Sequence, residues 1–292
     1  MTLDQLRVFV AVAERLHVTQ AAAALNMTQS AASAAIAALE ASLGIRLFDR
    51  VGRSIALTEA GRLLLPEARA VLSRIGQAVR VLDDLQGLRR GQLTLHASQT
   101  IAGYWLPPLM HRFLLSWPQV RLSLVIGNTA QVARAVADGD ADLGFVEGAV
   151  ADPLLVKVPL AADRLALVVA TGHELAGCAS LSTADLAAIP WVLREHGSGT
   201  RQVFEDALAA IGVDPARLTV HMELPSNEAV RSAVEAGAGA TVISSLVVER
   251  AIATGSLVAL PFAFPERRFT LLRHADRHRT RAELALLELL RA

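Results

Sequence analysis

The sequence predicts a mixed α/β fold with a small helical head, a long connecting helix and a larger two-lobed α/β domain. Apolar residues at three- and four-residue spacing dominate the first 90 residues of the 292-residue chain. From about residue 91, strand-like and helix-like segments alternate for long enough to build two sheets. With 53% hydrophobic and 19% charged residues, the chain is suited to bury several cores and is not of the disordered class.

Composition also restricts the partners and the compartment. Acidic and basic residues balance at 28 each, but residues 1–90 carry 11 arginines against 8 acidic residues, which favours an anionic partner for that part. Cys178 is the only cysteine, so an intrachain disulfide and a cysteine-rich metal site are excluded. The chain shows neither a secretory signal nor an apolar run long enough for a membrane span. We therefore expect a cytoplasmic protein with no membrane partner.

Residues 1–60 indicate a winged helix-turn-helix. An amphipathic helix begins at Leu3, a short alanine-rich helix that Thr19 is placed to cap follows, and Asn26-Met27 supplies a tight turn. The next helix begins at Thr28 and ends at about Leu43. Its predicted buried stripe consists of Ala32, Ile36, Leu39 and Leu43.

This last helix opens with polar, uncharged side chains, which suit a helix that enters the major groove of DNA. The candidate contacts to bases and phosphates are Thr28, Gln29, Ser30 and Ser33. Two short apolar segments around Gly52 then predict a β-hairpin wing, whose Arg50 and Arg53 would neutralise phosphates. Spacing alone, however, favours an ordinary helical bundle over a DNA reader.

Helical periodicity continues from Thr58, a suitable N-cap, to about Leu88, with Pro66 in its first turns. A helix of about 30 residues is about 45 Å long, which is more than a small head covers. It either lies along its own domain or pairs with a second copy of the chain.

The order of motifs in the head resembles the DNA-binding domain of LysR-type transcriptional regulators over about residues 1–65. The segments that carry the resemblance are Ala21-Ala22-Ala23-Ala24-Leu25, Thr28-Gln29-Ser30-Ala31-Ala32-Ser33, Leu39-Glu40, Leu43-Gly44, Leu47-Phe48-Asp49-Arg50 and Leu57-Thr58-Glu59-Ala60-Gly61. The resemblance implies a DNA-binding domain at 1–60 and a dimerising linker helix at 61–90. It also implies a homodimer or homotetramer on a two-fold symmetric site in double-stranded DNA.

The remainder, residues 91–292, is predicted to form two α/β lobes. Strands are expected at 93–97, 120–126 and 141–146 in the first lobe, and at 165–170, 191–193, 218–224 and 240–244 in the second. The final stretch returns to the first lobe, which gives lobe 1 as about 91–160 and 267–292, and lobe 2 as about 161–266. Alternating strands and helices predict parallel sheets. Two lobes with two crossovers resemble type 2 periplasmic solute-binding proteins, the effector-binding domain that follows a LysR-type head.

Small molecules bind at the carboxyl ends of strands in such sheets, and here between the lobes. The candidate ligand-binding residues are Ser98, Gln99, Thr100, Asn128, Thr129, Glu147, Gly197, Ser198, Gly199, Thr200 and Arg201. Any single hydroxyl at a helix start also fits a simple cap, but several of them in one cleft suit an anion. Glu147 would repel that anion unless it pairs with Arg201 or a protonated His196.

Within the family, the segments 97–101, 145–148, 194–201 and 226–230 look like the branch that includes regulators of sulfur assimilation, sulfite response and carbon fixation. That resemblance implies an oxyanion such as sulfite or sulfate, or a phosphorylated compound. The sequence offers no nucleophile–base set, no metal-ligand spacing and no cofactor motif, so we expect no catalytic site, metal or cofactor. A ligand-binding module whose head contacts other proteins is the alternative reading.

Overall fold

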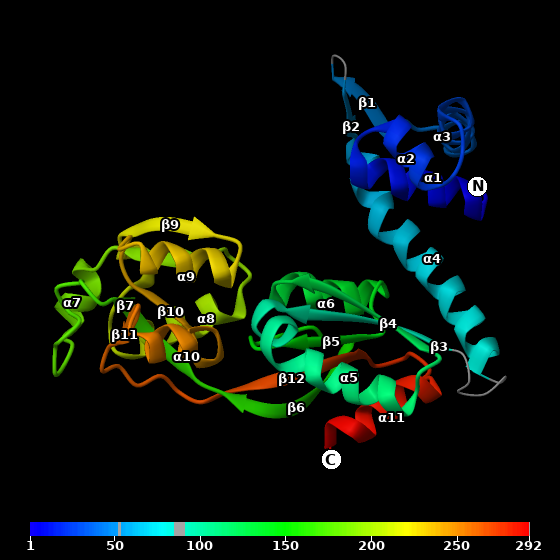
Figure 1. Cartoon of the computed structure of the whole chain (residues 1–292). Helices are drawn as coiled ribbons and strands as arrows, with labels where there is room; N and C mark the ends of the chain where they lie inside the picture. Colours follow the sequence, from blue (N-terminus) through cyan, green and yellow to red (C-terminus); the bar gives the residue numbers. More distant parts are fainter. Residues whose placement is uncertain (52–53, 85–90, 292) are drawn as a thin grey trace. The chain divides into compact units, whose positions relative to one another are not determined.

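The computed structural model describes residues 1–51, 54–84 and 91–291 and divides into two compact units, residues 1–85 and 86–292 (Figure 1). The predicted Arg53 lies outside the described residues. None of the helices described has both the length and the apolar character that a membrane crossing requires.

The first unit is a three-helix head with a hairpin. Its elements are α1 (Leu3–Arg15), α2 (Val18–Ala24), α3 (Gln29–Leu43), β1 (Phe48–Val51), β2 (Ser54–Leu57) and α4 (Glu59–Asp84). The prediction that Thr19 caps the short helix is wrong. The N-cap lies two residues earlier, because the Nδ1 atom of His17 accepts the N–H of Gln20 at 3.4 Å.

Helix α3 begins where the sequence placed it. The Thr28 hydroxyl accepts the N–H of Ala31 at 3.2 Å, and Gly44 ends the helix in a left-handed conformation. The predicted stripe is buried at Ala32, Ile36 and Leu39, but Leu43 is 40% exposed. Helical spacing identifies one face of a helix but not how far its neighbours extend along it, so the last position of the stripe was wrong.

Strands β1 and β2 form the antiparallel wing, with Arg50 opposite Ile55. The Glu40 carboxylate of α3 accepts the N–H groups of Leu47 and Phe48 at 2.7 and 3.1 Å, which ties the base of the wing to α3. These bonds satisfy two backbone donors that no strand partner reaches, so Glu40 determines where the wing leaves the head.

The first turn of the long helix α4 packs closely against the base of the wing. Thr58 caps it by accepting the N–H of Gly61 at 3.0 Å. A Cβ on Gly61 would lie 2.2 Å from the carbonyl oxygen of Leu47, so only glycine fits there. Helix α4 continues through Pro66 to Asp84; the predicted extension to Leu88 lies outside the described residues. The Arg69 guanidinium of α4 bonds the Glu14 carboxylate of α1 at 2.9 Å.

Lobe 1 of the second unit is built on a five-stranded sheet in the order β4-β3-β5-β12-β6. Its strands are β3 (Gly91–Ser98), β4 (Val120–Gly127), β5 (Leu143–Val146), β6 (Leu155–Asp163) and β12 (Arg267–His274). The prediction of a parallel sheet is correct for β4, β3 and β5 only. Strand β12 is antiparallel to both of its neighbours, because it belongs to the segment that returns from the second lobe.

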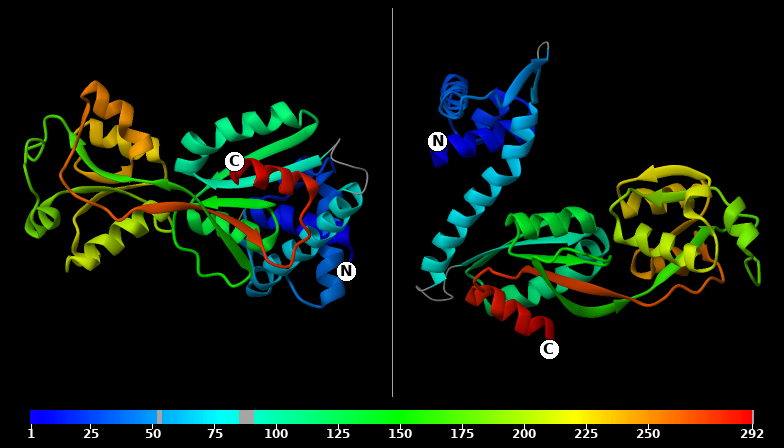
Figure 2. Two further views of the ribbon diagram at one scale, coloured as in Figure 1. Left: turned by 90° about the horizontal axis from the view of Figure 1, so that it is seen from below. Right: turned by 180° about the vertical axis from the view of Figure 1, so that it is seen from behind.

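Helices cover both faces of this sheet (Figure 2). The helices of lobe 1 are a π-helical turn at Ile101–Trp105, α5 (Leu106–Ser116), α6 (Thr129–Asp138) and α11 (Arg281–Arg291). Leu106 and Phe113 of α5 and Leu286 of α11 share one core with β3. Val132 and Val136 of α6 form a separate core on β5 and β12. Helix α6 begins two residues after β4 ends, so its start lies at the carboxyl end of that strand, where the sequence predicted ligand contacts.

Lobe 2 contains two small sheets, β10-β7-β11 and β8-β9, which an isolated bridge between Trp191 and Ala240 connects. Its strands are β7 (Leu165–Ala170), β8 (Trp191–Arg194), β9 (Val220–Leu224), β10 (Thr241–Ser244) and β11 (Leu257–Ala259). Its helices are α7 (Thr183–Ala188), α8 (Gly199–Ala210), a 3₁₀ turn at Pro215–Arg217, α9 (Asn227–Glu235) and α10 (Ser245–Thr254). Strands β8 and β9 pair in parallel, whereas β10 and β11 run antiparallel to β7.

The chain passes from lobe 1 to lobe 2 between β6 and β7 and returns between β11 and β12 (Figure 2). Both passages lie at the same side of the two lobes. The N-termini of α6 and α8, one from each lobe, meet at the junction of the lobes, where the N–H of Ala130 donates to the carbonyl oxygen of Gly197.

Candidate functional site

The polar side chains predicted to contact DNA lie together on the first turns of α3. Thr28, Gln29 and Ser30 are exposed and Ser33 is half-buried. The Gln29 amide donates to the Ser33 hydroxyl at 3.3 Å, and the hydroxyls of Thr28 and Ser30 are 3.1 Å apart. Neutral hydroxyls and an amide at an exposed helix N-terminus are suited to base edges and to phosphates.

The wing of the same unit carries an exposed cation. Arg50 is exposed on β1, and the hydrogen bonds of Glu40 fix that strand relative to α3. Its counterpart in the prediction, Arg53, is not among the described residues.

In the second unit, Glu147 is the centre of a buried polar cluster between the lobes. It follows β5 directly, is 5% exposed and accepts a hydrogen bond from the Ser98 hydroxyl at the end of β3. Burial raises the pKa of this carboxyl, against the opposing effects of Arg267 and Arg194, so the neutral form is favoured. The Glu147 carboxyl group is therefore the hydrogen-bond partner of the Ser98 and Thr100 hydroxyls, which the sequence analysis assigned to an external anion.

The expected partners of Glu147 were wrong. The Arg201 guanidinium bonds Glu205 and Glu223 at 2.7 and 2.6 Å and the carbonyl oxygen of Arg194 at 2.9 Å, all within lobe 2. His196 is exposed, with its Nε2 atom 4.0 Å from Glu223. The sequence placed Arg201 correctly at the start of α8. Its side chain pairs with Glu205 one helical turn later and with Glu223 of β9, which only the fold brings near.

Gln99 and Thr100 join the lobes instead of facing an empty cleft. The Gln99 amide donates to the carbonyl oxygen of Pro225 at 2.6 Å and accepts the N–H of Asn227 at 2.7 Å. The Asn227 amide donates to the Thr100 hydroxyl at 3.1 Å and accepts from Arg194 at 2.5 Å. Since Thr100, Asn227 and Arg194 are all buried, these bonds replace water on both lobe surfaces.

A buried ion pair completes the cluster. Arg267 bonds Asp163 at 2.7 Å and donates to the Thr200 hydroxyl of lobe 2 at 3.0 Å. The Ser244 hydroxyl donates to the second oxygen of Asp163 at 2.7 Å. The sequence did not identify Arg267 or Asp163, because each lies at the end of a strand with no motif around it. Arg194 and Asn227 stood inside quoted segments, but their roles were not recognised.

On the other side of the junction, the start of α6 contacts the loop before α8. Asn128 caps α6 and its amide also donates to Glu195 at 3.1 Å, while the N–H of Ala130 donates to the carbonyl oxygen of Gly197 at 3.3 Å. Gly148 and Gly199 touch there, since a Cβ on Gly199 would lie 2.6 Å from the nitrogen of Gly148.

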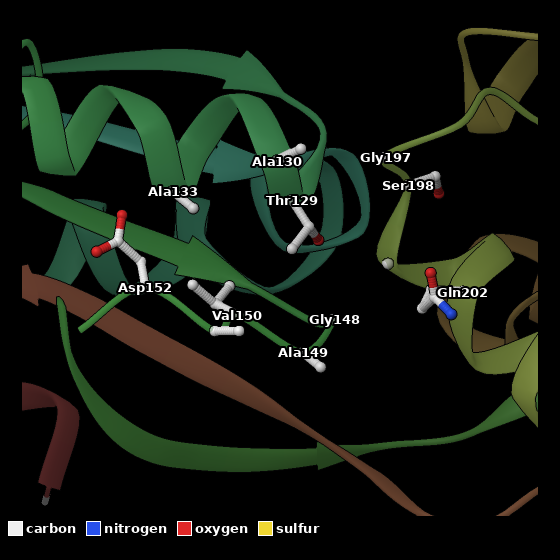
Figure 3. Close-up of a pocket in the computed structure, with 12 residues that line it drawn as sticks. Thr129, Ala130, Ala133, Gly148, Ala149, Val150, Asp152, Gly197, Ser198 and Gln202 are labelled. Carbon is white, nitrogen blue, oxygen red and sulfur yellow. The ribbon is translucent and has the colours of Figure 1, made fainter. Parts of the chain in front are cut away.

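A pocket of about 310 Å³ opens beside this contact (Figure 3). Of the predicted residues, Thr129, Gly197, Ser198 and Gly199 line it. Its other lining residues are Ala130, Ala133, Gly148, Ala149, Val150, Ala151, Asp152 and Gln202. The Thr129 hydroxyl is buried and without a hydrogen-bond partner, which is costly unless a ligand satisfies it. In the part of the chain that the structure describes, no group of three His, Cys, Asp or Glu residues is arranged to hold a metal ion.

Comparison with known families matches both units. Residues 3–62 match the bacterial regulatory helix-turn-helix protein family of the lysR type, and residues 86–292 match the LysR substrate binding domain. The uncharacterized HTH-type transcriptional regulator YeiE of Escherichia coli strain K12 is 37% identical over 284 residues, covering 97% of this chain and 94% of its own length. A probable RuBisCO transcriptional regulator of Synechocystis is 34% identical, covering 98% and 84%.

Solved structures agree on the fold. Full-length CbnR complexed with its target DNA superimposes with a TM-score of 0.70 at 23% identity, covering 100% of this chain and 99% of that one. The regulatory domain of CcmR from Synechocystis PCC6803, in complex with 2-PG, gives a TM-score of 0.63 at 27% identity, covering 69% and 96%. The predicted arrangement of a winged helix-turn-helix followed by a two-lobed effector-binding domain is thereby confirmed.

Proposed function

This chain belongs to the LysR family of DNA-binding transcriptional regulators, and from that premise we propose which residues hold DNA and what kind of effector controls it. The family consists of regulators and not of enzymes, in agreement with the prediction that the chain catalyses no reaction. A protein of this kind works where the DNA is, which supports the expected cytoplasmic location.

The first part of the proposal is that α3 reads the major groove while the wing holds the adjacent backbone. It rests on the exposed side chains of Thr28, Gln29 and Ser30 at one helix start, with Ser33 one turn later. Arg50 lies on the strand that Glu40 fixes, so it supplies the phosphate contact, and Arg53 is assigned the same role from its place in the sequence.

The second part is that two copies pair through α4 to present two α3 helices to a two-fold site, as a dimer or a pair of dimers. Leu63, Val71 and Val79 are 69%, 44% and 52% exposed along this helix, so α4 presents apolar side chains that its own unit does not cover. A second long helix packed against α4 would remove such side chains from water.

The third part is that a small effector carrying an oxyanion, of the sulfite, sulfate or phosphate kind, binds at the junction of the lobes. The observation that carries it is the convergence of two helix N-termini, of α6 and α8, beside the unpartnered hydroxyl of Thr129. The CcmR regulatory domain, which holds 2-PG, has the same fold over this region.

Binding of the full chain to the promoter region beside its own gene, across a salt series, tests the DNA-reading part. We expect sequence-selective binding, and Arg50→Ala should reduce the slope of log affinity against log salt by about one. Gln29→Ala should weaken specific binding while leaving that slope unchanged. Salt-insensitive binding, or no preference for any genomic fragment by a folded dimer, would contradict the proposal.

Thermal-shift titration with sulfite, sulfate, phosphate and phosphorylated sugars tests the effector part. A ligand at a hundredfold excess over its dissociation constant stabilises the protein by about 2.7 kcal/mol. We expect Thr129→Val to reduce the shift, because it removes the hydroxyl and keeps the volume. An unchanged shift in that variant would place the anion elsewhere.

A further inference from the structure

The pocket beside Thr129 is larger than an inorganic oxyanion needs. Its volume of about 310 Å³ compares with the roughly 30 Å³ that one water molecule occupies in the liquid. Small apolar side chains of α6 and of the loop after β5, namely Ala130, Ala133 and Val150, form much of its wall. Space of this size with an apolar wall suits an organic molecule of several heavy atoms.

One region of the pocket is suited to an anionic group. Thr129 is the first residue of α6 and Gly199 the first residue of α8, two helices of 10 and 12 residues. Ser198, the N-cap of α8, makes no side-chain capping bond, so it leaves the first-turn N–H groups uncapped. The Thr129 hydroxyl is buried, has no partner and faces Gly199, whose added Cβ would lie 2.6 Å from it.

The opposite region is suited to a cationic group. Asp152 lines the pocket on the Ala133 side of Thr129 (Figure 3). Its Oδ1 atom accepts the N–H of Leu154 at 2.8 Å, which holds the carboxylate in place. Ala133 lies four residues beyond Thr129 on α6, so one helical turn of about 6 Å separates the two regions. Among the 12 described residues that line the pocket, none is Lys or Arg.

An anion without a cationic group would meet Asp152 with no basic side chain to offset the repulsion. A ligand that carries its own ammonium removes this conflict, because the ammonium pairs with the carboxylate while the oxyanion takes the Thr129 hydroxyl and the uncapped N–H groups of α8. We propose that the pocket binds a small zwitterion whose oxyanion lies at Thr129 and the start of α8 and whose ammonium lies at Asp152. This inference rests on the proposed effector function and narrows the class of effector.

The test compares two probes that differ only in the ammonium: 2-aminoethanesulfonate and ethanesulfonate, each titrated against the full chain by thermal shift. We expect the amino compound to bind about fivefold more tightly, which corresponds to about 1 kcal/mol for a partly exposed ion pair. Asp152→Asn should abolish this preference while ethanesulfonate binds at least as well as before. β-Alanine and propionate provide the same comparison for a carboxylate.

Glu288→Gln, which removes an exposed charge of α11, a helix that packs on the other face of the sheet from α6, is the matched control and should retain the preference. Equal binding of the two probes, stronger binding of ethanesulfonate, or binding of neither probe by protein that still recognises its DNA would overturn the assignment of a zwitterion. Failure of the DNA experiment, by contrast, would overturn the proposed function, so the two failures are distinguishable.

Discussion

Gly148 and Gly199 meet backbone to backbone across the junction of the two lobes. A Cβ on Gly148 would lie 2.7 Å from the Cα of Gly199, and one on Gly199 would lie 2.6 Å from the nitrogen of Gly148. Neither contact is possible for a residue with a side chain, so the lobes approach this closely only because both positions are glycine.

Gly199→Ala should therefore force the lobes apart at this point. Overpacking of a tight contact costs about 1–3 kcal/mol, so we expect a lower free energy of unfolding of the effector domain in urea. Hydrogen exchange at the N–H of Ala130, which bonds Gly197 across the junction, should become faster. Gly172→Ala is the matched control, since open space surrounds that glycine, and it should change neither quantity.

Glu147→Gln should alter the pH dependence of stability. Burial raises the pKa of this carboxyl in the folded protein, so folding favours its protonated form. The resulting stability is fully present below the ordinary carboxyl pKa and is lost as the pH rises towards the folded pKa. The slope is at most about 1.4 kcal/mol per pH unit for one proton. The glutamine variant should lack this loss, whereas the exposed Glu249→Gln should retain it. Parallel curves for wild type and Glu147→Gln would disprove the assignment.

Arg267→Met should be among the most destabilising substitutions in the effector domain. It leaves the buried Asp163 without its cation, which costs about 3–5 kcal/mol in comparable buried pairs. Adding Asp163→Leu to the same variant should recover part of the loss, because no uncompensated charge remains. Arg7→Met, at an exposed pair with Asp4, is expected to stay within about 1 kcal/mol of wild type in denaturant unfolding.

Glu40→Ala should lower both the free energy of unfolding of the DNA-binding domain and its affinity for DNA. The carboxylate accepts two backbone N–H groups at the base of the wing, and hydrogen bonds to charged groups contribute about 1.5–3 kcal/mol. We expect reduced unfolding free energy and reduced affinity for the promoter fragment. Glu67→Ala, an exposed position of α4, should leave both measurements near wild type. A destabilised variant with full DNA affinity would show that the wing does not depend on Glu40.

Tyr104 allows a direct reading of one contact between the lobes, because it is the only tyrosine in the chain. Burial, together with a hydrogen bond and the charge of Glu228, raises the pKa of this phenol to about 12. Ultraviolet titration of the folded protein should give that value, and the ordinary value near 10 in urea. Glu228→Gln should lower it, since only burial and a neutral bond remain. A folded-state value near 10 would mean that the contact is absent in solution.

Local sequence patterns were sufficient for the head and for the order of strands. Caps such as Thr28 and Thr58, the helical spacing of apolar residues and the glycines at helix ends act over three or four residues, so they are readable in a single sequence. The motif order then identified the family, and with it the two-lobed domain. The parallel sheet was over-predicted, because strand direction at β12 depends on the returning segment and not on its own residues.

The site divides in the same way. The sequence determined that Ser98, Thr129 and Gly199 stand at the ends of strands and the starts of helices, and it placed them near one junction. Only the tertiary structure decided that Glu147 accepts the hydrogen bond of the Ser98 hydroxyl and that the Arg201 side chain pairs within its own lobe. It also decided that Asp152 lines the pocket. These outcomes depend on distances between residues far apart in the chain, and such distances are set by packing and burial rather than by spacing along the sequence.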